Sequence, residues 1–258
     1  MRIWYQSGAP LGKMPLFKPY EDALKRHLQS VVRIGTVVDA YGIEIISPVF
    51  NRSNYVQYLD AAHWISNART AEQQGYDAFA GGCMLDTGSL QIREVIDIPA
   101  AFSAETSFHF ACLLARKFSI LSYEQWGLFQ MEELVKQYGL LERYVPGSCL
   151  SITMEQLADG FSHPAPIIEA VKKGARRAIE GGAGILVSGC NILTMILVDS
   201  NVREIDSVPV LNNVGIIVKF AELLVDMKEI GVTRSKKGFY ASLSKDELAL
   251  VRRAHGLE

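Results

Sequence analysis

Short apolar runs alternate with segments of helical periodicity along most of the chain. Near the N-terminus, Tyr20, Ala23, Leu24 and Leu28 recur at the spacing of one apolar helix face. Apolar runs typical of strands occupy residues 2–5, 35–39, 77–82, 118–122, 150–152 and 184–189, and helical patterns occupy residues 55–75, 104–115 and 167–180. This alternation is typical of βαβ units around a parallel sheet, so the pattern predicts an α/β fold.

Two of the predicted strands, one in each half of the chain, run directly into a cysteine. These residues are Cys83 and Cys190. Each cysteine is followed by a helical stretch and then by a similar short segment, at residues 96–99 and 206–209. The chain therefore contains an internal repeat.

The repeat predicts two similar Rossmann-like α/β/α domains with parallel sheets, related by pseudo-symmetry. We expect residues 1–115 to form the first domain, with the C-terminal helices of residues 213–258 returning to it. Residues 116–212 would form the second domain. In open α/β sheets, ligands bind outside the carboxyl ends of the strands, so the active site is expected in the cleft between the domains.

The position of the two cysteines suggests reactive thiols. A thiol at the N-terminal end of a helix feels free backbone N–H groups and the helix dipole, and both lower its pKa. We therefore expect Cys83 and Cys190 to be activated. Cys112 lies in a helical stretch and Cys149 lies beside a Pro-Gly pair, so we interpret these two as packing residues.

Composition excludes several classes of protein. With 49% hydrophobic and 21% charged residues among 258, the chain can bury a core and is not a disordered protein. Its 26 basic and 28 acidic residues give a net charge of -2, which offers no electrostatic footprint for nucleic acid or an anionic membrane. No apolar run approaches the roughly 20 residues of a membrane span, so we expect a cytoplasmic protein.

The sequence contains no motif for a metal or a nucleotide cofactor. The four cysteines include no C-x-x-C pair, so we expect no metal site. The glycine-rich segment 181–184 precedes a strand, whereas a dinucleotide-binding glycine turn follows one. We expect a reaction that needs no cofactor, a small-molecule substrate, and a homo-oligomer with no nucleic-acid or membrane partner.

Residues 82–94, GCMLDTGSLQIRE, resemble the first cysteine motif of hydantoin racemases, in the aspartate/glutamate racemase superfamily. Residues 187–190, VSGC, resemble the second cysteine motif, while residues 208–211 and 233–236 resemble the strand that follows it and a basic turn. The resemblance covers essentially the whole chain. It implies two similar α/β domains around one active site, and a cofactor-independent racemase with two cysteines as acid and base.

The chemistry of racemisation can use two thiols. One group must take a proton alpha to a carbonyl from one face, and a second must deliver a proton to the other face. A thiol has an ordinary pKa of about 8.5, so modest tuning leaves one cysteine as thiolate and its partner protonated. The negative charge that develops on the carbonyl oxygen needs N–H donors, which we expect near Met84, Asn191 and Ile192.

Two loops that are expected to line the cleft depart from the family pattern. Residues 6–9, QSGA, stand where the family has Asn-Pro-Asn-Thr, and Asn212 and Asn213 stand where it has an Asp-Pro turn. We expect Ser7 and these two asparagines to contact a substrate that is hydantoin-like or a small carboxylated compound. The alternatives are a maleate-type cis-trans isomerase or decarboxylase of the same superfamily, and a non-catalytic two-domain protein that binds a small ligand.

Overall fold

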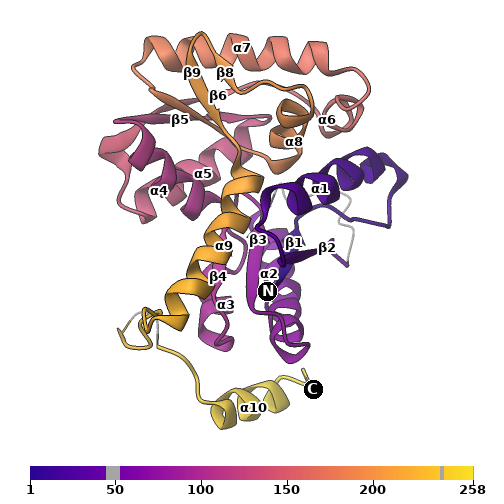
Figure 1. Cartoon of the computed structure of the whole chain (residues 1–258), viewed down its shortest axis with the longest axis vertical. Coiled ribbons are helices and arrows are strands. Elements are labelled where there is room, and N and C mark those ends of the chain that lie inside the picture. The colour runs from indigo at the N-terminus through magenta and orange to yellow at the C-terminus, as the bar shows by residue number, and fades with distance from the viewer. Residues whose placement is uncertain (45–52, 239–240, 258) are drawn as a thin grey trace.

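The computed structural model describes residues 1–44, 53–238 and 241–257. Its described residues contain two parallel sheets, each covered by helices on both faces, and the two halves are stacked along the long axis of the molecule (Figure 1). The predicted α/β class with two parallel-sheet domains is therefore confirmed.

The first sheet has the strand order β2-β1-β3-β4, with all pairs parallel. Its strands are β1 (Arg2–Ser7), β2 (Val37–Tyr41), β3 (Ala78–Gly82) and β4 (Ala100–Phe102). The helices around it are η1 (Pro15–Phe17), α1 (Lys18–Val31), α2 (Asn54–Gln73), α3 (Ser89–Val95) and α9 (Asn213–Glu229). Because side chains alternate along a strand, Ile3 and Tyr5 pack with α1 and α9, whereas Trp4 packs with α2 on the opposite face.

The second sheet has the order β6-β5-β7-β9-β8, in which only β8 is antiparallel to its neighbour. Its strands are β5 (Phe118–Ser122), β6 (Tyr144–Cys149), β7 (Ile185–Ser188), β8 (Glu204–Ile205) and β9 (Val208–Leu211). The helices are α4 (Ser103–Leu114), α5 (Gln125–Gln137), η2 (Leu141–Arg143), α6 (Met154–Asp159), α7 (Pro164–Glu180) and α8 (Asn191–Asp199). Leu121 and Leu186 pack with α7, while Ile120 and Val187 face α4 and α5.

The two sheets repeat one topology. In each, the first strand in sequence lies between the second and the third, and the third pairs on its other side with a later parallel strand, β4 in the first sheet and β9 in the second. β3 and β7 are therefore equivalent third strands, and they lead into Cys83 and Cys190 respectively. The repeat places both cysteines at carboxyl ends of central strands, where ligands of such sheets bind.

Packing assigns some segments differently from the sequence pattern. α4 falls within the predicted first domain, yet its Phe108 packs in one core with Phe118 and Ile120 of the second sheet. α9 crosses back to pack on the first sheet. The strand predicted at residues 150–152 is wrong: the strand is β6, which contains Pro146 and lies at the sheet edge, where a proline is tolerated.

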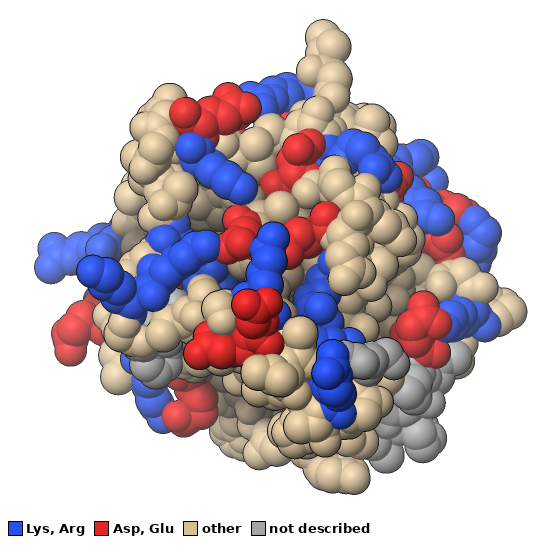
Figure 2. All heavy atoms as spheres, turned by 90° about the horizontal axis from the view of Figure 1, so that it is seen from below, with Lys and Arg blue, Asp and Glu red and all other residues tan. Residues whose placement is uncertain are grey.

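The C-terminal segment ends in α10 (Lys245–Ala254), which has no buried residue and lies outside the two-domain body (Figure 1). In the described part of the chain, no helix combines the length and apolar character needed to cross a membrane. Figure 2 shows basic and acidic side chains interspersed over the face seen from below, without a large region of one sign.

Candidate active site

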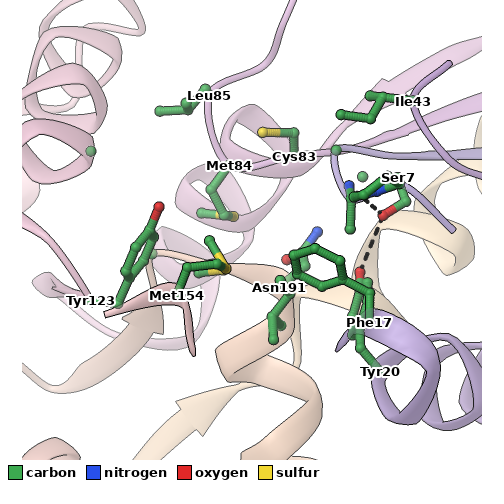
Figure 3. Close-up of a pocket in the computed structure, with 18 of the residues that line it drawn as sticks. Ser7, Phe17, Tyr20, Ile43, Cys83, Met84, Leu85, Tyr123, Met154 and Asn191 are labelled. Atoms are coloured by element: carbon green, nitrogen blue, oxygen red, sulfur yellow. Dashed lines mark hydrogen bonds between the residues drawn. The ribbon is translucent and has the colours of Figure 1, made fainter. Parts of the chain in front are cut away.

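One cavity lies where the carboxyl ends of the two sheets meet. It is lined by the loop after β1, by α1, by both Gly-Cys segments, and by residues after β5 and at the start of α6 and α8. Most of its walls are apolar, with Phe17, Ile43, Met84, Leu85 and Met154 pointing toward the space (Figure 3). The structure thus brings Cys83 and Cys190 to the wall of the same cavity.

Cys83 is held by the tight packing of the residue before it. A Cβ added at Gly82 would lie 2.2 Å from Cζ of Tyr5, whose side chain is fully buried. After Cys83 the chain forms a turn, closed by a hydrogen bond from the Asp86 N–H to the Cys83 carbonyl at 3.1 Å. Helix α3 begins only at Ser89, so Cys83 is not at a helix N-terminus, contrary to the expectation.

Cys190 is the N-cap residue of α8. The backbone N–H groups of Leu193 and Ile192 lower the pKa of its thiol, although its side chain forms no capping hydrogen bond with the first turn. Gly189 is also required by close packing, because a Cβ there would lie 2.6 Å from Cε of Met131 and 3.0 Å from Cα of Ser122. This thiol therefore has the helix environment that the sequence predicted for both.

The expectation of lowered thiol pKa values is corrected by the structure. Burial raises the pKa of Cys83 to about 12, against smaller lowering effects of hydrogen bonds from the Leu85 N–H and the Thr87 hydroxyl. Burial also raises the pKa of Cys190, because the loss of solvent outweighs the two N–H donors of α8. Burial therefore favours the protonated form of both thiols.

Asp86 connects the Cys83 turn to the second domain. This buried residue has a φ of 46°, and its carboxylate accepts the N–H groups of Ala104 and Glu105, each at 2.8 Å, and the hydroxyl of Tyr138 at 2.6 Å. Burial raises its pKa to about 6, against the lowering effect of those three hydrogen bonds. The sequence signal for this link between the domains is the Asp-Thr-Gly turn alone, and the motifs did not predict the link.

Four of the six residues predicted to bind substrate line the cavity: Ser7, Met84, Asn191 and Ile192. The Ser7 hydroxyl accepts the N–H of Ala9 at 3.1 Å. The Asn191 side chain is already occupied, because it donates to Ser103 and Tyr5, at 3.0 and 3.3 Å. Ile192 lies in the first turn of α8 beside Cys190, and its N–H lowers the pKa of that thiol.

The structure does not bring Asn212 and Asn213 into the cavity lining, which corrects their assignment as cleft contacts. Asn212 caps α9, with its Oδ1 accepting the N–H of Gly215 at 2.9 Å, and it contacts His27. Asn213 is fully buried and donates to the Ser188 carbonyl at 2.6 Å, behind β7. Both side chains are used in joining α9 to its neighbours.

The sequence did not predict two kinds of cavity residue: those that reach it from a helix, and those that follow a strand that does not end in a cysteine. Tyr20 of α1 lies in the apolar helix stripe and reads as a packing residue, and Met154 begins α6. Tyr123 follows β5 at its carboxyl end, which was an available signal, and its hydroxyl donates to Glu124 Oε1 at 2.8 Å. Cys112 and Cys149 pack against the core of the second sheet and do not line the cavity.

Comparison with known proteins identifies the family. A family model described as Asp/Glu/Hydantoin racemase matches residues 20–221. The chain belongs to this family. A hydantoin racemase from Pseudomonas sp. (strain NS671) is 30% identical over 239 residues, which are 92% of this chain and 91% of the relative. A second hydantoin racemase, from Paenarthrobacter aurescens, is 28% identical over 82% of this chain and 87% of its own length.

Solved structures support the same assignment. An allantoin racemase from Klebsiella pneumoniae has a TM-score of 0.79 and 25% identity, covering 95% of this chain and 94% of the other. A glutamate racemase from Bacillus anthracis has a TM-score of 0.63 at 13% identity, over 98% and 93% of the two chains, and is alike in fold alone. The resemblance to hydantoin racemases is confirmed, and this member of the family is an isomerase of the racemase type.

No group of three or more His, Cys, Asp or Glu side chains in the described ranges is arranged to hold a metal ion. The lining side chains of the cavity carry polar groups of four kinds: the thiols of Cys83 and Cys190, the hydroxyls of Ser7 and Tyr20, the amide of Asn191 and the carboxylate of Glu124. The Tyr123 hydroxyl also lies in the lining and is bound to Glu124. Thiols and hydroxyls can exchange and donate protons, which is the chemistry that racemisation requires.

Proposed function

We propose that this racemase inverts a neutral five-membered ring of the hydantoin class, with Cys83 and Cys190 as the two acid/base groups. The observation that carries the proposal is that both thiols line one cavity from equivalent strand ends of opposite domains. The names of the relatives support the substrate class, since they are hydantoin and allantoin racemases.

The lining of the cavity favours a neutral substrate over a dicarboxylate or an amino acid. Among the described lining residues there is no Lys, Arg or His to pair with a substrate carboxylate, and the acidic Glu124 is present. A buried carboxylate without a cation is costly. The apolar wall formed by Phe17, Ile43 and Met154 favours a ring with an apolar substituent over allantoin, which carries a polar ureido group.

The reaction proceeds by removal and return of one proton. A thiolate takes the hydrogen from the ring carbon next to the carbonyl, and the C–H electron pair becomes a C=C bond while the carbonyl π pair moves onto oxygen. The opposite thiol then protonates the same carbon from the other face, and the carbonyl is restored. At the end, the two cysteines have exchanged protonation states, and no cofactor enters the balance.

Raised thiol pKa values suit this chemistry. A thiolate that is scarce in the resting enzyme is also a stronger base, and a C–H group next to a carbonyl is a weak acid. Burial of both sulfurs by the same apolar walls therefore lowers the fraction of thiolate but makes each thiolate a stronger base.

The test follows one enantiomer each of 5-benzylhydantoin, allantoin and aspartate in D2O by circular dichroism and NMR, with the uncatalysed reaction in parallel. We expect racemisation with deuterium uptake at the ring carbon, fastest for 5-benzylhydantoin. Cys83→Ala and Cys190→Ala should each lower the rate by about 10² to 10⁴-fold, and Cys112→Ala should leave it unchanged. Absence of enzyme-catalysed exchange with every compound would overturn the proposal, and full activity in either of the first two variants would overturn the two-thiol mechanism.

A further inference from the structure

A line of buried hydrogen-bonding groups runs behind the cavity from the second domain to the first. It begins at Ser103 of α4 and Asn191 of α8, which hydrogen-bond each other, and continues through Asn191 Nδ2 to the Tyr5 hydroxyl at 3.3 Å. The Tyr5 and Tyr20 hydroxyls are neighbours that influence each other's pKa. The Tyr20 hydroxyl ends the line at the cavity, 3.5 Å from Ser7 Oγ (Figure 3).

The chemistry of these groups sets the direction of the line. An amide nitrogen only donates, so the Tyr5 hydroxyl accepts from Asn191 and its single proton can turn toward the neighbouring Tyr20 hydroxyl. The proton of the Tyr20 hydroxyl is then left for Ser7 or for a ligand. Its bond to Ser7 is at the limit of hydrogen-bond distance, and Ser7 already accepts the Ala9 N–H at 3.1 Å.

The side-chain amide expected to hold a developing oxyanion is engaged elsewhere. Asn191 uses it to bind Ser103 and Tyr5. Tyr20 is only 2% exposed, yet it lines the cavity. Because most of the neighbouring wall is apolar, its hydroxyl is one of few polar atoms there that a bound ring would meet.

The phenol of Tyr20 remains protonated over the working range of the enzyme. Burial raises its pKa, and negative charge on Cys190 or Cys83 would raise it further, while hydrogen bonds from Ser7 and Tyr5 lower it. Tyr20 lines the same cavity as Cys83 and Cys190, so its hydroxyl borders the space in which the reacting carbon must lie.

We propose that Tyr20 is a further catalytic residue, whose hydroxyl donates a hydrogen bond to the substrate carbonyl oxygen as it becomes an enolate oxyanion. Tyr5 and Asn191 act as positioning residues that orient the Tyr20 proton toward the cavity. The inference rests on the proposed function. The Tyr20 proton is not transferred: it stays on the phenol oxygen while the C–H pair moves onto the carbonyl oxygen, and the hydrogen bond weakens again when the ring carbon is reprotonated.

Tyr20→Phe removes the hydroxyl and keeps the ring that lines the wall. With 5-benzylhydantoin, or whichever panel compound the wild type racemises fastest, we expect kcat to fall about 100-fold with KM changed less than about threefold. Tyr5→Phe should give a smaller fall in kcat, since Tyr20 keeps its own proton. The matched control is Tyr76→Phe, because Tyr76 is equally buried and its hydroxyl bonds Tyr41 and Asp39 on the far side of the first sheet, so kcat should not change.

A second variant covers the case in which Tyr20→Phe does not fold. Incorporation of a trifluorotyrosine at position 20 keeps the hydroxyl and lowers its pKa, so kcat should fall at an alkaline pH at which the wild type still works. Wild-type kcat in Tyr20→Phe, or an unmoved alkaline limb in the fluorinated enzyme, would overturn the role of Tyr20. If the wild type itself shows no substrate exchange, the proposed function fails instead, so the two failures are distinguishable.

Discussion

A methyl group added at residue 82 tests how tightly β3 is packed against Tyr5. In Gly82→Ala, the new Cβ would lie 2.2 Å from Cζ, 2.3 Å from the hydroxyl oxygen and 2.6 Å from Cε1 of Tyr5. Carbon atoms in contact normally lie about 3.5–4.0 Å apart, so the ring or the strand must move by more than about 1 Å. Tyr5 is fully buried in the core between β1, α1 and α9, which leaves its ring no open space to enter.

Overpacking of this kind costs about 1–3 kcal/mol of unfolding free energy. Urea unfolding followed by circular dichroism measures it, with Gly127→Ala as the control. Gly127 lies in α5, where the nearest atom to an added Cβ is 3.5 Å away, so alanine should stabilise the protein by about 0.5 kcal/mol. We also expect Gly82→Ala to lower kcat, because Tyr5 holds Tyr20. Wild-type stability and kcat in Gly82→Ala would refute the argument that this contact fixes the Cys83 strand.

Two further predictions concern titration. Burial raises the pKa of Cys83 to about 12 and also raises that of Cys190. Both kcat/KM and the rate at which iodoacetamide alkylates the two thiols should therefore rise about tenfold per pH unit from pH 6.5 to 8.5. A plateau near pH 7 would contradict this prediction. Burial raises the pKa of Asp86 from 3.8 to about 6, so its protonated form stabilises the fold at low pH and that contribution is lost as the pH rises through about 6. The free energy of unfolding of the wild type, relative to Asp86→Asn, should fall by about 1 kcal/mol between pH 5 and 7 in parallel urea titrations, and equal pH dependence in the two proteins would be the contrary result.

The strand ends that carry the site could be predicted from the sequence because their signal is local. Buried central strands of a parallel sheet read as continuous apolar runs, and the two that end in Gly-Cys mark equivalent points of a repeated topology. Edge strands carry a weaker signal. β6 contains Pro146 and has only two buried residues, Val145 and Ser148, so the apolar run at residues 150–152 gave the stronger strand signal.

Contacts between segments far apart in the chain had no comparable signal. Tyr20 is spaced like any core residue of α1, and nothing in that spacing indicates a hydroxyl that meets Tyr5 and a cavity. Asn212 and Asn213 follow β9, where ligand contacts are common, yet the start of α9 uses both amides for capping and packing. Position along a sheet edge predicts which loops surround a site, whereas the direction of each side chain depends on the packing of helices.

The pKa values of the thiols show why a repeat in sequence does not make two chemically equal sites. Two backbone N–H groups of α8 lower the pKa of Cys190 and the charge of Glu124 raises it, while one N–H and a hydroxyl lower the pKa of Cys83 and the charges of Cys190 and Asp86 raise it. The N-terminus of α8 therefore favours a thiolate on Cys190 more than the turn after β3 favours one on Cys83. The singly ionised pair should carry its thiolate on Cys190, so the enantiomer whose hydrogen faces Cys190 meets the enzyme in the form that is ready to react. The opposite enantiomer needs the proton to move from Cys83 to Cys190 first, and Asp86 makes that form less populated.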